Sequence, residues 1–170
     1  DMNRYLDGLG AAAPRKNLEA IVRSRQFHPT VQRRLETSQD GQENGPGTPA
    51  CEAEMRYRAA FGAAIDRVMT AERLDAFVYP TWSNVPRLIG DLNTPHGDNS
   101  QVFSPTSGYP AINVPMGYTR GNTLPAGVTF FGRAWDEAAL IRLAYGYEQQ
   151  TRHRRPPALV SSRARAPGRR

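Results

Sequence analysis

The residues Leu74-Asp-Ala-Phe-Val-Tyr-Pro-Thr81 form the first of three stretches that decide the fold. This short apolar run, stopped by Pro80, predicts a strand buried on both faces. The second stretch is Ser107-Gly-Tyr-Pro-Ala-Ile-Asn-Val-Pro-Met-Gly117, and the third is Leu124-Pro-Ala-Gly-Val-Thr-Phe-Phe-Gly-Arg133. Residues 111–118 alternate in polarity, and residues 126–131 follow after the breaker-rich segment 120–125. These two stretches therefore predict a β-hairpin.

Helices are predicted before and after these strands. Residues 17–25 begin with Asn17, a residue type that caps helix N-termini, and indicate a short helix. Residues 51–74 predict a long helix because four apolar residues recur at offsets of four, four and three: Tyr57, Phe61, Ile65 and Val68. A last helix follows Asp136, a second potential N-cap, and ends within residues 152–157. Its apolar stripe consists of Leu140, Leu143, Ala144 and Tyr147.

Two loops and a tail separate or follow these elements. Residues 40–49 hold five glycines and prolines and predict a surface loop. Residues 81–109 form a polar connection much longer than usual, and loops of that length are commonly functional. After Pro157, serine, arginine, alanine, proline and glycine dominate, so we expect residues 158–170 to be a disordered, arginine-rich tail.

Composition limits the class of protein. A chain of 170 residues with 39% apolar side chains has material for one compact domain. No run approaches the roughly 18 apolar residues of a membrane helix. Cys51 is the only cysteine, which excludes an intrachain disulfide and a cysteine-rich zinc site and favours a cytoplasmic protein. Residues 152–170 hold seven arginines and no acidic residue, and nucleic-acid binding by this segment is not expected because no aromatic residues are interleaved.

The three stretches, in this order, resemble the C-terminal region of the amidase-signature family. That family has strands of the type "DALVxPT", followed by "GxPAxxVPxG", "GLPxGxQxxG" and a helix ending near "RxxP". The resemblance covers Leu74 to Pro157, and residues 1–9 and 17–22 are similar to helices that precede this region. It implies an α/β fold: part of a mixed β-sheet with flanking helices, from the C-terminal side of an α/β/α sandwich, with residues 1–157 as part of an amidase domain.

The family's chemistry uses a serine nucleophile, a bridging serine and a lysine, with glycine-rich backbone amides that stabilise the oxyanion. Lys16 is the only lysine, and no Gly/Ser-rich stretch follows it in residues 17–157. The sole Ser-Ser pair, Ser161 and Ser162, lies in the tail. We therefore expect no catalytic residue in this chain and no cofactor. The three histidines match no zinc pattern, so no metal site is predicted.

Substrate-contacting residues are predicted in the long connection, since α/β folds commonly place sites at the C-terminal ends of strands. Trp82 is the preferred contact, because its indole supplies flat apolar area. Three hydroxyl residues complete the prediction: Ser104, Thr106 and Ser107. Two alternatives stay open, namely that the indole packs on the protein's own surface and that the hydroxyls bond to local backbone.

The sequence thus predicts a C-terminal fragment of a hydrolase acting on amide carbon–nitrogen bonds, inactive alone and lacking the Ser-Ser-Lys segment. Its partners would be the missing N-terminal amidase portion and, in the parent enzyme, a small-molecule amide. A homodimer is possible by family analogy, and no membrane partner is expected. The alternative is a free-standing, non-catalytic protein-binding module derived from an amidase.

Overall fold

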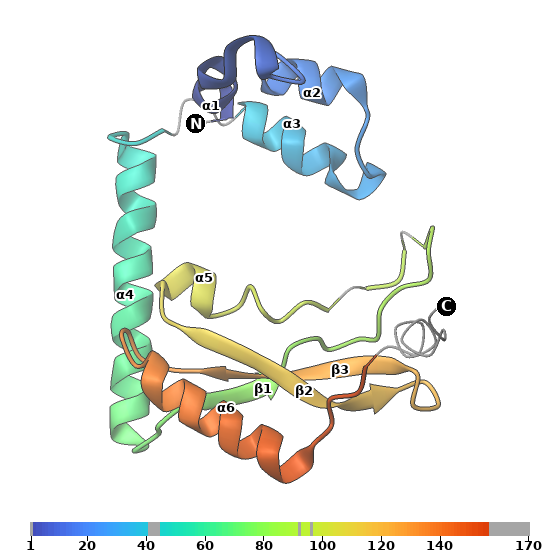
Figure 1. Cartoon of the computed structure of the whole chain (residues 1–170). Coiled ribbons are helices and arrows are strands. Elements are labelled where there is room, and N and C mark those ends of the chain that lie inside the picture. The colour runs from blue at the N-terminus through green and yellow to red at the C-terminus, as the bar shows by residue number, and fades with distance from the viewer. Residues whose placement is uncertain (1, 41–44, 92, 96, 157–170) are drawn as a thin grey trace, which may run out of the picture. The chain divides into compact units, whose positions relative to one another are not determined.

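The computed structural model in Figure 1 describes residues 2–40, 45–91, 93–95 and 97–156. The predicted tail, residues 158–170, lies outside the described residues. The chain divides into two compact units, residues 1–57 and 58–170. The single amidase domain over residues 1–157 stays a prediction. The second unit contains the three stretches that decide the fold.

The first unit contains three short helices: α1 (Met2–Leu9), α2 (Leu18–Ser24) and α3 (Gln32–Asp40). The Asn17 side chain accepts a hydrogen bond from the Ala20 N–H at 2.8 Å, which confirms the predicted N-cap of α2. Asn3 of α1 accepts a bond from the Leu18 N–H at 2.8 Å, so α1 is fastened to the start of α2. Helix α3 was not predicted, because Leu35 is its only apolar residue and no periodicity is detectable.

Helix α4 (Pro49–Ala71) is the predicted long helix, but it begins earlier and buries a different face. Proline is favoured in the first helical turn because its missing N–H has no intrahelical role there. The predicted stripe is wrong in part, since Tyr57 is 58% exposed and Val68 is 47% exposed. The buried positions are Gly62, Ile65 and Met69. A Cβ on Gly62 would lie 3.2 Å from the Tyr109 hydroxyl, so the contact face centres on a glycine, which an apolar pattern does not count.

The sheet of the second unit consists of β1 (Phe77–Pro80), β2 (Ala111–Thr119) and β3 (Leu124–Phe131), in the order β1-β3-β2. The predicted hairpin is confirmed as the antiparallel β2–β3 pair, with a register shift between Pro115 and Gly117. Strand β1 also pairs antiparallel to β3, so these three strands alone do not display a mixed sheet. The prediction that β1 is buried on both faces was wrong, since Val78 is 58% exposed. The covering helix α6 (Glu137–Thr151) packs against β2 and β3 instead.

Different layers cover the two faces of the sheet (Figure 1). On one face, Val128 and Phe130 of β3 pack against Leu140 and Ala144 of α6. On the other face, Phe131 packs with residues of α4 and with the aromatic rings that the long connection carries beside its short helix α5 (Ser104–Ser107). Those rings belong to Phe103 and Tyr109.

The start of α6 differs from the predicted N-cap. Asp136 occupies the N-cap position, yet its side chain makes no capping bond, because its backbone (φ −103°, ψ 32°) is not in the β region that directs a cap toward the helix. Its carbonyl instead accepts from the Ala139 and Leu140 N–H groups. Leu143, predicted in the apolar stripe, is 38% exposed, so Leu140 and Ala144 form the buried contact of this helix.

Polar contacts fasten α4 to the sheet. The Tyr109 hydroxyl donates to the Asp66 carboxylate at 2.6 Å, and the Arg133 guanidinium lies 3.6 Å from that carboxylate and donates to the Asp66 carbonyl at 3.2 Å. The hydrogen bond to Asp66, reinforced by burial and by the carboxylate's charge, raises the pKa of Tyr109 above its ordinary value, against the opposing charge of Arg133. Tyr109 therefore remains a neutral donor at physiological pH and ties the segment just before β2 to α4.

A second polar chain crosses the sheet where β1 ends. The Thr81 hydroxyl lies 2.9 Å from the Thr129 hydroxyl, which donates to Asn113 Oδ1 at 2.7 Å. Both threonines are buried, and the Thr81 N–H donates to the Gly127 carbonyl at 2.9 Å. A Cβ on Gly127 would lie 2.9 Å from Thr81 Oγ1, so only glycine allows this close approach. These contacts fix the point at which the chain leaves the sheet.

We expect Thr81→Val and Thr129→Val each to lower the free energy of unfolding by about 1–2 kcal/mol, since each removes the buried hydrogen bond between the two hydroxyls. The double variant should lose less than the sum of the two, because this shared bond can be lost only once. Thermal and urea unfolding of the four proteins, with Thr37→Val on the exposed side of α3 as a control, measures this coupling. Strictly additive losses would show that the two hydroxyls do not act as a pair.

Candidate functional site

The long connection leaves the sheet at Thr81 and then pairs with itself. Trp82 forms a bridge with Asp98, and the Ser83 N–H donates to the Gly97 carbonyl at 2.7 Å. Asn99 closes this excursion, since its backbone N–H donates to the Thr81 carbonyl at 2.9 Å and its side-chain amide donates to the Pro80 carbonyl at 2.8 Å. Residues after Trp82 are thus drawn away from β3, whose first residues lack a neighbour on that side among the described residues.

Gly97 makes the close pairing possible. Its φ is +63°, and a Cβ there would lie 2.6 Å from the Asn84 side-chain nitrogen and 2.9 Å from the Asn84 backbone nitrogen. Any larger residue would push residues 83 and 84 outward. The position of residues 82–87 therefore depends on a glycine more distant along the chain.

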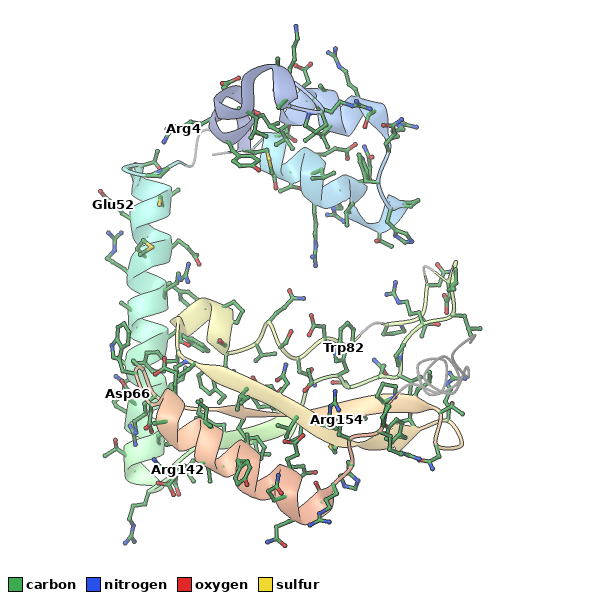
Figure 2. All side chains as sticks on the ribbon, viewed as in Figure 1. Arg4, Glu52, Asp66, Trp82, Arg142 and Arg154 are labelled. Atoms are coloured by element: carbon green, nitrogen blue, oxygen red, sulfur yellow. The ribbon has the colours of Figure 1, made fainter. Side chains whose placement is uncertain are left out.

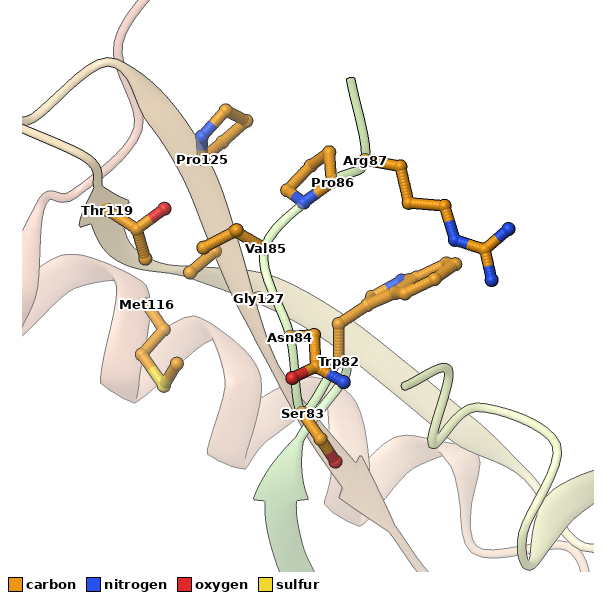
Figure 3. A pocket seen from close by; sticks show the side chains of 11 residues that line it. Trp82, Ser83, Asn84, Val85, Pro86, Arg87, Met116, Thr119, Pro125 and Gly127 are labelled. Carbon is orange, nitrogen blue, oxygen red and sulfur yellow. The ribbon is translucent and has the colours of Figure 1, made fainter. Parts of the chain in front are cut away.

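A cavity of about 480 Å³ lies where this segment separates from the β2–β3 hairpin (Figure 3). Small-molecule sites typically measure roughly 300–1,000 Å³. Its walls come from the connection, the end of β2 and the start of β3. The lining residues are Trp82, Ser83, Asn84, Val85, Pro86, Arg87, Met116, Thr119, Pro125, Ala126 and Gly127.

The cavity wall is mainly apolar and carries one formal charge. Pro125 fits this position of β3, because proline lacks a backbone donor and, on the side of β3 opposite β2, no described strand pairs with it there. Of the described residues that line the cavity, Arg87 alone has an ionisable side chain. Its Nε atom is buried and has no hydrogen-bond partner among the described residues. An apolar wall with one half-buried cationic side chain suits an apolar organic molecule with an acceptor group.

The structure separates the residues that the sequence predicted as a substrate site. Trp82 lines the cavity and is 48% exposed, so it is available for contact. The three hydroxyl residues of α5, namely Ser104, Thr106 and Ser107, do not line it. Helix α5 is bound to α4, the helix that carries Asp66, whereas Trp82 lies on the connection; Figure 2 labels both residues.

The α5 hydroxyls serve local structure. Ser104 Oγ donates to the Tyr109 carbonyl at 2.7 Å, and Ser107 Oγ donates to the Phe103 carbonyl at 2.8 Å and accepts from the Tyr109 N–H at 3.1 Å. The Thr106 carbonyl accepts from Arg58 Nε at 3.0 Å. The hydroxyl bonds of Ser104 and Ser107 match the alternative of local backbone bonding, and substrate contact by Ser104, Thr106 and Ser107 stays a prediction.

Sequence reasoning missed most of the cavity wall. Val85 and Arg87 lie in a segment without periodicity, and Met116 and Pro125 reach the cavity only through the register of the hairpin. The cluster of prolines and glycines between residues 86 and 97 marked an irregular segment, but it could not indicate which strand that segment would lie beside.

The described part of the chain shows neither a cluster of metal-binding side chains nor a helix of membrane-spanning length and polarity. Within residues 2–40, 45–91, 93–95 and 97–156, no group of three or more His, Cys, Asp or Glu side chains is placed to hold a metal ion, and Cys51 is a free thiol. No helix in the described ranges is long and apolar enough to cross a membrane.

Lys16 is exposed, and Ser24, which lines the same shallow hollow, donates its hydroxyl to the Ile21 carbonyl at 2.7 Å.

Comparison with known proteins places these features in a family. The family model "Amidase" matches residues 2–141. A probable amidase of Arabidopsis thaliana is 34% identical over 97 residues, 57% of this chain and 16% of the relative. A glutamyl-tRNA(Gln) amidotransferase subunit from Moorella thermoacetica is 28% identical over 170 residues, 94% of this chain and 34% of the relative.

Solved structures give the same result. The peptide amidase of Stenotrophomonas maltophilia superposes with a TM-score of 0.70 at 33% identity, over 91% of this chain and 31% of that enzyme. This similarity confirms the predicted α/β class and the partial amidase-signature fold. The chain spans about a third or less of the length of these relatives. By its sequence and its fold, this chain belongs to the amidase family.

Proposed function

We propose that the chain is the C-terminal part of a longer hydrolase of amide carbon–nitrogen bonds, called the parent enzyme below. In this proposal the chain supplies three strands, the covering helix α6 and one wall of the substrate pocket. Family membership and the small share of each relative that the chain spans support it. The observation that carries it is the apolar cavity beside Trp82, at the end of a strand of the family fold.

The catalytic serines and lysine would come from residues outside these 170. A lysine acts as a base only when its surroundings keep it neutral, and burial is the usual cause. Lys16, the only lysine in the sequence, is exposed to solvent. Ser104 and Ser107 use their hydroxyls to hold backbone groups, which leaves neither in the arrangement of a nucleophile beside a base.

Exposed apolar surface supports contact with further protein. Val78 of β1 is 58% exposed, and Leu88 and Ile89 of the connection are 75% and 107% exposed. Strand β1 is an edge of the sheet, with no pairing strand on its outer side among the described residues. An open strand edge next to apolar side chains is a surface that proteins normally cover. The missing amidase portion is the proposed cover.

We expect the purified 170-residue chain to hydrolyse no aryl amide. The same chain expressed together with the reading frame that precedes Asp1 should hydrolyse the amide and lose this activity with a serine-directed inhibitor. An aryl amide assay and the upstream DNA sequence check both parts. Inhibitor-sensitive turnover by the chain alone would contradict the proposal. A start codon directly before Asp1 would favour the non-catalytic binding module instead.

Trp82→Ala in the parent enzyme should lower kcat/KM roughly tenfold or more for a large apolar amide, and less for a small one, because lost apolar contact scales with buried area. Trp135→Ala is the matched control, since Trp135 is 92% exposed and does not line the cavity. Steady-state kinetics on both amides measure the ratio. Equal losses on both substrates, together with a lower Tm, would assign Trp82 to packing.

A further inference from the structure

Arg87 is the feature of the cavity that the proposed function does not use. It follows Trp82 along the connection, and Figure 3 shows both side chains projecting from the segment that forms one wall. A guanidinium keeps its charge at every physiological pH and offers five donors. The Nε of Arg87 is buried and has no hydrogen-bond partner among the described residues. The residue as a whole is half-buried and lies on an otherwise mainly apolar cavity wall, so its guanidinium is the group there that would attract an anion.

We propose that this cavity binds apolar organic acids, with the Arg87 guanidinium holding the carboxylate and the wall of Trp82, Val85 and Met116 holding the apolar body. As the substrate class of the parent enzyme, this means amides that carry a carboxylate away from the scissile bond, and to that extent the inference rests on the proposed function. Binding of an acid by the cavity does not depend on catalysis.

The size of the cavity agrees with such a ligand. An engineered cavity of about 150 Å³ accommodates benzene. The cavity beside Trp82 measures about 480 Å³, so it has room for an aromatic ring and a short chain that ends in a carboxylate. The apolar residues supply contact area, and the guanidinium supplies charge-assisted hydrogen bonds, which fix one end of the ligand.

The charges around the cavity favour a ligand that carries a single negative charge. Among the described residues that line the cavity, Arg87 is the only cationic one. Asp91 follows on the same segment and holds its own turn: bonds from the Thr94 side chain and from the Thr94 and Asn93 backbone, with a smaller effect of the Arg87 charge, lower its pKa to about 2. Asp91 is therefore ionised at neutral pH and partly offsets Arg87. A carboxylate fits this balance better than a dianionic phosphate.

The test uses the complete 170-residue chain carrying Trp135→Phe, so that Trp82 is its only tryptophan. Binding of 4-phenylbutyrate, of the neutral isostere 4-phenylbutyramide and of 3-phenylpropylphosphonate is followed by Trp82 fluorescence and by calorimetry. We expect the carboxylate to bind at least tenfold more tightly than the amide and more tightly than the phosphonate. Arg87→Met should abolish the preference for the acid while binding of the amide stays within about twofold.

Arg142→Met is the matched control, because Arg142 lies on the exposed side of α6 and does not line the cavity. It should leave all three affinities unchanged. Equal binding of acid and amide by the unmodified cavity, retention of the preference in Arg87→Met, tighter binding of the phosphonate, or no binding of any probe would each overturn the inference. Because no catalysis is measured, inactivity of the parent enzyme would leave a positive binding result intact, so the two proposals fail separately.

Discussion

The hydroxyl of Thr81 lies 2.9 Å from that of Thr129, and only a glycine at position 127 leaves room for it. This contact ends β1, because the Thr81 N–H makes the last bond to β3 and the chain then pairs with residues 97–99. The connection is thereby held at a fixed distance from the hairpin, and the cavity lies in the space between them. The buried contact between Thr81 and Thr129 thus accounts both for the end of β1 and for the position of the cavity.

Packing on both faces of the sheet holds the hairpin and the long connection in place around the end of β1. The α6 face is aliphatic and aromatic, with Phe130 and Leu140 at its centre, and it fixes the hairpin. On the other face, the Phe103 and Phe131 rings stack with centroids 5.4 Å apart, which anchors the far end of the connection. A segment anchored by packing at one end and by hydrogen bonds at the other can present Trp82 and Arg87 without secondary structure of its own.

The sequence was most informative where a local pattern controls local structure. The alternation of residues 111–118 and the breakers that follow predicted the hairpin, and Asn17 predicted the start of α2. Long-range contacts limited the rest: the buried face of α4 is set by Gly62 against Tyr109, and α3 has a single apolar residue. Trp82 was predicted because it follows a strand directly. Arg87 was not, since its place beside β3 depends on Gly97 and on the strand register.

A structure of the parent enzyme with an amide analogue attached to its nucleophile is the most direct test of the claim that this chain forms one wall of a substrate pocket. We expect the part of the analogue distant from the nucleophile to lie in van der Waals contact with Trp82 and with β3 at Ala126 and Gly127. An analogue bound against the α5 hydroxyls, with the cavity filled by another part of the parent enzyme, would contradict it.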